Sequence, residues 1–235
     1  MANIYFKFKQ FTVWHDRCAM KVGTDGVLLG AWAAGGVHIL DIGTGTGLVA
    51  LMMAQRFKNA SITAIEIDRT AAGQAQENVD RSPFKERVRV VAGDVCDWAE
   101  NNGSLSFDAI VCNPPFFVDA LKNPDAKRAM ARHVGSLTFP RLMQVGASLL
   151  SAQGSFSLII PADMKNLVEA EAYMAGLFLN ECCMVKTNGN KLPKRCLMRF
   201  SKQKVEQVFL QTTVLEEPPG ARSPWYQSLT SEFYL

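Results

Sequence analysis

The sequence predicts a doubly wound α/β fold, in which helices cover both faces of a mostly parallel β-sheet. Between residues 38 and 175, segments with strand character alternate with segments with helix character. Several predicted strands are apolar on both faces, as Ala109, Ile110 and Val111 show, and this is typical of strands buried between two layers of helices. The 235 residues have room for one large domain, or for one domain with a small appendage.

The first 33 residues are expected to form an N-terminal extension. Aromatic and basic residues roughly alternate within residues 2–22, which indicates a short strand or hairpin. Its aromatic residues Phe6, Phe8 and Phe11 are expected to be core rather than base-stacking residues. Residues 24–33 predict a helix with Thr24 as its N-cap. We therefore expect one domain over residues 1–235, divided into this extension (1–33) and a core (34–235).

The core begins with alternating elements and ends with strands alone. Predicted strands are His38–Ile42, Ser61–Ile67, Val88–Val91, Phe107–Cys112 and Ser155–Pro161, and predicted helices are Gly47–Phe57, Arg69–Val79, Cys96–Glu100, Thr138–Leu150 and Ala162–Ala175. Three further segments have no helices between them and are expected to be antiparallel strands that close the sheet edge. They are Glu181–Thr187, Arg195–Ser201 and Val205–Val214.

The composition excludes several classes of protein. With 48% hydrophobic and 20% charged residues, the chain is expected to be a packed globule and not a disordered protein. No apolar run approaches the roughly 20 residues that cross a bilayer, and the N-terminus lacks a signal peptide's apolar core. We therefore expect a cytoplasmic protein without membrane contact. Six cysteines without a CxxC pair, and only three histidines, predict reduced thiols and no zinc site.

A glycine-rich turn follows the first core strand and opens the next helix. Gly43, Gly45 and Gly47 allow a tight turn and let a ligand lie against bare backbone. A dinucleotide-binding turn has the spacing G-x-G-x-x-G, but here the third glycine comes one residue early and Leu48 holds the expected position. Asp41 precedes the first glycine and adds a carboxylate, although a plain glycine-rich turn is the alternative.

Two further strand ends carry acidic residues. Glu66 ends the second core strand, where a carboxylate can accept both ribose hydroxyls of a nucleoside. Asp68 is expected to cap the next helix and to have only a secondary role in ligand binding. Asp94 and Val95 follow the third core strand, where an ordinary loop is the alternative to a binding role.

Together with Asp41, the glycine turn resembles the first motif of class I S-adenosylmethionine-dependent methyltransferases. The resemblance implies a Rossmann-like fold with a mostly parallel seven-stranded sheet that is antiparallel at its C-terminal edge. It implies S-adenosyl-L-methionine as the cofactor, with no metal, and it implies that Asp41 engages the amino-acid part and Glu66 the ribose. It also implies that Asp94 accepts a hydrogen bond from the cofactor's adenine amine, beside the backbone amide of Val95.

The tetrapeptide Asn113-Pro114-Pro115-Phe116 follows the fourth core strand and is expected to be catalytic, with Asn113 also bordering the cofactor. The prolines hold the backbone rigid and extended at the edge where open α/β sheets bind ligands. An exocyclic amine on a purine is a poor nucleophile, and the Asn113 oxygen and Pro114 carbonyl can accept its two hydrogens so that its lone pair faces the methyl group. Phe116 can stack on the base, worth roughly 1–3 kcal/mol, once the base leaves its stack.

Both ends of the chain narrow the resemblance. Residues 8–11, 15–32 and 229–234, with the glycine turn and the tetrapeptide, are similar to bacterial tRNA adenine-N6 methyltransferases that act beside the anticodon of valine tRNA. The resemblance implies tRNA as the partner, with methyl transfer to the N6 amine of anticodon-loop nucleotide 37, and no obligate protein partner. It places Thr24, Asp25 and Lys21 over the cofactor. A helix cap with a first-turn acid is the alternative for Thr24 and Asp25.

The tetrapeptide alone leaves other acceptors open, namely guanine N2 in rRNA and glutamine N5 in proteins. Related glutamine-modifying enzymes carry Tyr more often at the fourth position and have a separate helical N-terminal domain, and some guanine-modifying enzymes have a second methyltransferase-like half. This chain has room for neither, which favours adenine. A non-catalytic RNA-binding module is the alternative of another class, and the intact Asp41, Glu66, Asp94 and tetrapeptide argue against it.

Basic residues gather in two places, although the net charge is only +3. One group has no acidic residue between its members, and the other lies in a polar loop, residues 119–133, that is expected to be flexible and on the substrate side. Around the pocket they could contact phosphates, and solvated edge-strand residues are the alternative. The groups are Lys186, Lys191, Lys194, Arg195, Arg199, Lys202 and Lys204, and Lys127, Arg128, Arg132 and His133.

Overall fold

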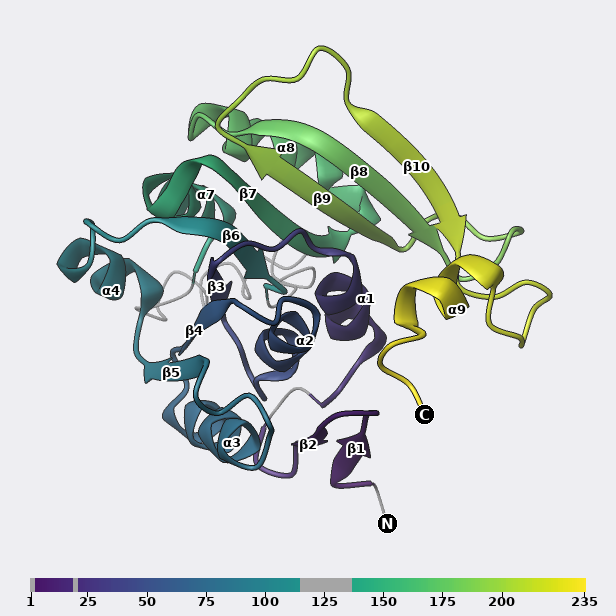
Figure 1. Ribbon diagram of the computed structural model, residues 1–235. Coiled ribbons are helices and arrows are strands. Elements are labelled where there is room, and N and C mark those ends of the chain that lie inside the picture. Colours follow the sequence, from purple (N-terminus) through teal and green to yellow (C-terminus); the bar gives the residue numbers. More distant parts are fainter. Residues whose placement is uncertain (1–2, 19–20, 115–136) are drawn as a thin grey trace, which may run out of the picture.

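Five parallel strands form the centre of the sheet in the computed structural model, which describes residues 3–18, 21–114 and 137–235 (Figure 1). They lie in the order β7-β6-β3-β4-β5, and every neighbouring pair is parallel. The strand order reverses at β3, and ligands of open α/β sheets bind outside the carboxyl ends of the strands at such a switch point. The strands are β3 (His38–Ile42), β4 (Ser61–Glu66), β5 (Val88–Ala92), β6 (Phe107–Cys112) and β7 (Leu150–Pro161).

Helices cover both faces of this sheet, and each face has its own hydrophobic core. One core contains residues of α1, α2 and α3, and the other contains residues of α4, α7 and α8 (Figure 1). Along β6, Ala109 and Val111 belong to the first core and Ile110 and Cys112 to the second, which is why the strand is apolar on both faces. The helices are α1 (Thr24–Trp32), α2 (Leu48–Arg56), α3 (Arg69–Asp80), α4 (Val95–Asn101), α7 (Phe139–Leu149) and α8 (Lys165–Met174). The predicted α/β class is confirmed.

Several predicted elements, β8 and β10 below among them, begin at other residues than expected, and two of these differences have a clear structural cause. The strand expected from Ser155 begins at Leu150, and its first part pairs with β6 across a register shift. This part includes residues that favour turns, so the sequence pattern did not indicate a strand there. The helix expected from Ala162 begins with a 3₁₀ turn, η1 (Ala162–Met164), before α8.

Three strands extend the sheet beyond β7, and one of them corrects the prediction. As expected, β9 (Arg195–Ser201) is antiparallel to β7 and to β8 (Phe178–Lys186), but β10 (Phe209–Val214) is parallel to β8. Both edges of β9 are occupied, so β10 cannot form a hairpin with it and pairs with the free edge of β8. Since β10 starts near the end of β9, it runs in the direction of β8. Within the described residues the sheet therefore has eight strands instead of seven.

The N-terminal residues form the predicted hairpin, in which β1 (Tyr5–Lys7) pairs antiparallel with β2 (Thr12–Trp14). Phe8 and Phe11 are buried in the core next to α1 and α2, as predicted. They therefore stabilise the extension against the core and do not form a surface for stacking bases.

A buried amide on α3 fastens this hairpin to the glycine turn. Asn78 Oδ1 accepts the Trp14 backbone N–H (2.8 Å), and its Nδ2 donates to the carbonyls of Trp14 (2.8 Å) and Thr46 (2.9 Å). The side chain is fully buried. Because all of these bonds are made away from water, the hairpin and the turn are held in a fixed relation to α3.

Helix α1 begins with a different cap from the one predicted. Gly23 is the N-cap, with extended backbone (φ −127°, ψ 163°), and its carbonyl accepts the first helical bond from the Val27 N–H at 3.3 Å. Thr24 is the first helical residue, and no side chain caps this end. The predicted capping role of Thr24 is therefore wrong.

The C-terminal segment packs against the N-terminal hairpin, and it contains a helix, α9 (Pro224–Thr230), that the sequence did not predict. Phe233 is 2% exposed, and its carbonyl accepts the Lys9 backbone N–H at 2.8 Å. The ring of Tyr234 stacks on that of Phe8, with centroids 6.1 Å apart. The two ends of the chain thus stabilise each other.

Five of the six cysteines are buried, as expected for small apolar residues, and Cys18 is partly exposed. No helix within the described residues is long and apolar enough to cross a membrane. In that same part of the chain, no three His, Cys, Asp or Glu side chains come together as metal ligands. The loop predicted over 119–133 lies outside the described residues.

Candidate active site

The glycine turn joins β3 to α2 with a backbone that only glycine adopts readily. Gly43 (φ 69°), Gly45 (φ 57°) and Gly47 (φ 82°) all lie in the left-handed region. A Cβ atom added at Gly43 or Gly45 would meet nothing within 4 Å, whereas one at Gly47, the N-cap of α2, would lie 3.5 Å from the Ala75 Cβ. The first two glycines therefore present bare backbone to open space, where a ligand can lie.

Asp41, near the end of β3, is a buried carboxylate with an unusual pKa. The side chain is 1% exposed, and its Oδ2 accepts hydrogen bonds from Thr44 Oγ1 (2.5 Å) and the Ala50 N–H (3.1 Å). Burial raises the pKa of Asp41 to about 7, and the charge of Glu66 adds to the rise, although the two hydrogen bonds oppose it. A carboxylate in such surroundings gains much from a cationic partner.

Glu66 ends the neighbouring strand β4, and backbone groups hold both of its oxygens. Oε2 accepts the Gly45 N–H at 2.8 Å, and Oε1 accepts the Asp68 N–H at 3.0 Å. The first bond fixes the carboxylate beside the glycine turn. Each carboxylate oxygen has a further acceptor position, so this geometry still allows Glu66 to accept two hydroxyl groups.

Asp68 and Asp94 are both helix N-caps. Asp68 accepts the N–H groups of Thr70 (2.7 Å) and Ala71 (2.9 Å) at the start of α3, as predicted. Asp94 accepts the Cys96 N–H at 2.7 Å at the start of α4, whose first residue is Val95. The capping role of Asp94 was not predicted, and it leaves the predicted cofactor role open.

Four strand ends carry these polar groups in a row along the carboxyl edge of the sheet. The order of the strands places Asn113 (after β6), Asp41 (β3), Glu66 (β4) and Asp94 (after β5) side by side. Neighbouring strands lie about 4.8 Å apart, so the row spans roughly 14 Å. Asn113 and Glu66 flank β3 on the same edge, as the sequence predicted.

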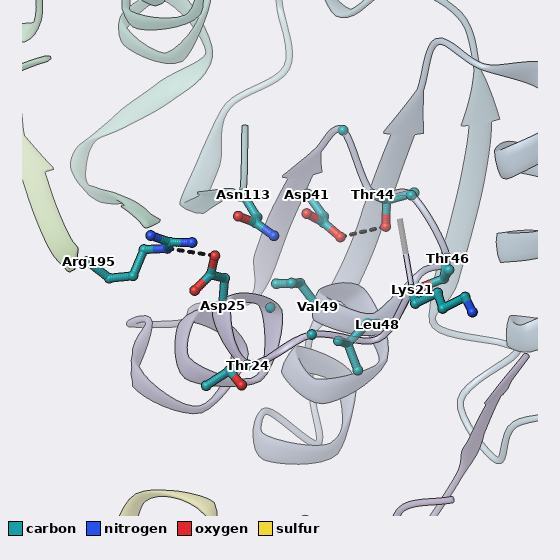
Figure 2. A pocket seen from close by; sticks show the side chains of 14 residues that line it. Lys21, Thr24, Asp25, Asp41, Thr44, Thr46, Leu48, Val49, Asn113 and Arg195 are labelled. Carbon is teal, nitrogen blue, oxygen red and sulfur yellow. Dashed lines mark hydrogen bonds and ion pairs between the residues drawn. The ribbon is translucent and has the colours of Figure 1, made fainter. Parts of the chain in front are cut away.

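Asn113 is the least satisfied polar residue of this row. Its Oδ1 is buried and, among the described residues, accepts no hydrogen bond. A buried acceptor without a donor costs about 1–3 kcal/mol and is rare in native proteins. Asn113 also lines a cavity (Figure 2), and an N–H or O–H group of a ligand that reached its oxygen would satisfy it.

This cavity, of about 310 Å³, lies between α1, the glycine turn and the end of β6 (Figure 2). It brings together seven of the predicted site residues with others that the sequence did not single out. The predicted ones are Lys21, Thr24, Asp25, Asp41, Gly43, Gly45 and Asn113, and the others are Gly23, Gly26, Thr44, Thr46, Leu48, Val49 and Arg195.

Six further predicted site residues of the described part of the chain do not line the cavity. Most of them lie along the same sheet edge, and they are Gly47, Glu66, Asp68, Asp94, Val95 and Pro114. The predicted stacking residue Phe116 and its neighbour Pro115 lie outside the described residues.

Arg195 is the charged residue among the cavity-lining residues that sequence reasoning missed. Its Nε donates to Asp25 Oδ2 at 2.7 Å, and this ion pair closes one side of the cavity (Figure 2). The sequence placed Arg195 only in a basic stretch. No local sequence signal could have found it, because its place follows from the register of β9, where Arg195 pairs with Pro161 at the carboxyl end of β7.

Comparisons with known proteins agree with this geometry. Residues 23–191 match the family described as "Methyltransferase small domain". A relative from Bacteroides thetaiotaomicron named tRNA1(Val) (adenine(37)-N6)-methyltransferase is 50% identical over 100% of this chain and 99% of its own length. A relative with the same name from Enterobacter sp. is 43% identical over 98% of this chain and 94% of its own length.

Solved structures share the fold at low sequence identity. A predicted O-methyltransferase, Atu636 from Agrobacterium tumefaciens, has a TM-score of 0.66 and 20% identity over 89% of this chain and 96% of that one. A methyltransferase from Pyrococcus furiosus has a TM-score of 0.53 and 22% identity over 75% of this chain and 80% of that one. The Rossmann-like methyltransferase fold is thereby confirmed.

Proposed function

The chain belongs to the methyltransferase small domain family and, with its full-length relatives, to the bacterial tRNA (adenine-N6)-methyltransferases. From this premise we propose that it methylates the N6 amine of adenine 37 in valine tRNA. S-adenosyl-L-methionine is the methyl donor of the family, and tRNA is the macromolecular substrate. The proposed place of action is the cytoplasm, where tRNA is modified.

The residues of the site fit the proposed cofactor. Asp41 offers a buried carboxylate to the ammonium group of the methionine part, and the bare backbone of Gly43 and Gly45 offers a surface against which the donor can lie. Glu66 and Asp94, further along the row, are suited to the ribose hydroxyls and the adenine amine. The row runs from an amino-acid site to a nucleoside site, which supports this assignment.

Asn113 carries the proposal for the acceptor side. Its buried Oδ1 has no donor among the described residues, and the exocyclic amine of adenine has two N–H groups to donate. We assign one of them to this oxygen and the other to the Pro114 carbonyl, so that the amine lone pair faces the methyl group. Transfer then depends on alignment.

When bound, the cofactor supplies a methyl group on a sulfonium, which is already activated toward nucleophiles. The chain therefore needs to supply neither a strong base nor a metal for the transfer. The role of Asn113 and Pro114 is to orient the amine, and the extra proton leaves to water afterwards.

The test uses two transcripts of valine tRNA, one with adenine and one with guanine at position 37. Each is incubated with the full chain and labelled S-adenosylmethionine, digested to nucleosides and analysed by mass spectrometry. We expect N6-methyladenosine from the first transcript alone. Label in N2-methylguanosine, or label only in added protein, would favour the guanine or glutamine alternative. Equal methylation of other tRNAs that carry adenine 37 would refute the specificity for valine tRNA.

A further inference from the structure

The basic stretch of residues 186–204 has members at both ends of the parallel strands, some at the carboxyl edge of the sheet and some at the opposite edge. β8 ends at Lys186 and β9 begins at Arg195, opposite Pro161 at the carboxyl end of β7, so the turn between β8 and β9 lies at the edge that carries the site. Lys202 lies at the other edge, since its Nζ donates to the carbonyl of Leu150 at the start of β7 (2.7 Å). Lys204 follows it there. Four of the seven basic residues therefore lie on the site edge.

A mid-strand residue of the stretch is neutralised within the sheet. Arg199 forms an ion pair with Glu181 at 2.7 Å and lies over the Trp32 ring, 4.6 Å from its centroid. It holds β9 against β8 and α1, so its charge is not presented to a partner. On the edge that carries the site, the exposed charge of the stretch is therefore confined to the turn.

The turn is joined directly to the cavity. Arg195 lines the cavity and is paired with Asp25, and the Lys194 carbonyl accepts the Ala162 N–H at 3.1 Å, which ties the turn to the end of β7. The lysines next to Arg195 are therefore held at the rim of the site.

Two lysines of the turn present their ammonium groups to solvent, where a binding partner can reach them. Lys191 and Lys194 are exposed, and among the described residues neither Nζ has a hydrogen bond or ion pair. Two acidic residues lie near this turn. Asp163 lies in η1, and the backbone N–H of Glu216 donates to the Thr187 carbonyl at 2.9 Å. Neither carboxylate pairs with the two lysines.

We propose that the β8–β9 turn, residues 186–195, binds the phosphates that flank the target nucleotide, with Lys191 and Lys194 as the contacting cations. The proposal rests on the function proposed above, since it takes RNA as the substrate. A base that enters a closed pocket must leave its stack, and its neighbouring phosphates then lie at the rim of that pocket. Phosphate contacts by lysines position the substrate without reading its sequence.

The test compares two neutralised variants with equal charge. Lys191→Gln with Lys194→Gln removes the proposed contacts, and Lys58→Gln with Lys204→Gln removes two exposed lysines from the opposite edge. Each pair lowers the net charge from +3 to +1 (3 − 2 = 1). Affinity for the valine tRNA transcript is measured by fluorescence anisotropy at several salt concentrations.

For Lys191→Gln with Lys194→Gln, we expect the magnitude of the slope of log affinity against log salt to fall by roughly 1.4 to 1.8. At 0.15 M salt the affinity for the tRNA should fall by about 15- to 30-fold, as calculated from a slope of about 0.7 to 0.9 for each of the two phosphate contacts. The opposite-edge pair should change neither quantity, and both variants should bind S-adenosylmethionine like the original chain. Each single variant should lower the magnitude of the slope by about 0.7 to 0.9.

Equal slopes in the two double variants would overturn the proposal, because the effect would then follow net charge and not position. An unchanged slope in Lys191→Gln with Lys194→Gln would overturn it as well. Failure of the proposed function is distinguishable, since the original chain would then form no N6-methyladenosine whatever the slopes are.

Discussion

Replacing Asp41 by asparagine should stabilise the protein while it weakens cofactor binding. The carboxylate is fully buried, and burial raises its pKa from 3.8 to about 7. Asparagine has nearly the same shape, and its oxygen can accept the same bonds from Thr44 Oγ1 and the Ala50 N–H. The substitution therefore removes a buried charge and keeps the packing.

The magnitude follows from the pKa difference. In the folded chain Asp41 holds its proton more tightly than in the unfolded chain, so the stability of the original protein falls as pH rises from 3.8 to about 7. A rise of about three pKa units corresponds to about 4 kcal/mol above pH 7 and to about 2 kcal/mol at pH 5. Asp41→Asn escapes this cost, and its Tm at pH 8 should rise by about 8–16 °C.

The assay is thermal and urea unfolding at pH 5 and pH 8, with calorimetric titration of S-adenosylmethionine at pH 8. Asp80→Asn is the matched control, because Asp80 is an exposed carboxylate on α3. The control should be neutral at both values of pH. Asp41→Asn should bind the cofactor roughly 10- to 100-fold more weakly, since a hydrogen bond to a charged group contributes about 1.5–3 kcal/mol. A variant no more stable than the control at pH 8 would refute the reasoning, and so would unchanged cofactor affinity.

The other site residues give three further expectations. Asn113→Ala should lower kcat roughly 100-fold through loss of alignment and change the cofactor Kd by less than about twofold. Asn101→Ala is the exposed control. Equal effects of Asn113→Ala on kcat and on Kd would contradict its role in orienting the amine. Glu66→Gln should weaken cofactor binding by about tenfold or more, and much less for a 2′-deoxyribose analogue; equal losses for both ligands would exclude a ribose contact. Asp68→Ala should cost about 1 kcal/mol in urea unfolding through loss of the α3 cap, and a neutral result would show that the cap is dispensable.

The parallel half of the fold could be predicted because its signals are local. Apolar runs, glycine turns and capping residues such as Asp68 follow one another along the sequence, and β6 was predicted with its observed bounds. The helix α9 was missed because its seven residues pack against α1, which lies far away in the sequence. The direction of β10 was missed for a similar reason: it depends on which strand edge is free, and no local pattern encodes that.

The candidate site likewise contains residues that local sequence signals predict and residues that only long-range pairing brings there. Asp41 and Asn113 follow strands that the sequence defines well, and the sheet order then brings their strand ends together. Arg195 comes from a strand that reaches the site only through antiparallel pairing with β7. Its partner Asp25 was predicted from a resemblance, but the ion pair between them joins segments 170 residues apart. Such a contact becomes visible only once the fold is known.

Two buried groups of this sheet edge, Asp41 and Asn113, lie at the ends of adjacent strands and line the same cavity. One is a buried anion whose pKa has risen to about 7, and the other is a buried acceptor without a donor in the described residues. An apolar pair would make a more stable fold here, so stability alone does not account for these residues. A ligand ammonium and a ligand N–H would satisfy both. The stability that these two groups cost the fold is thus available as binding energy, directed at a zwitterionic methyl donor and an amine acceptor.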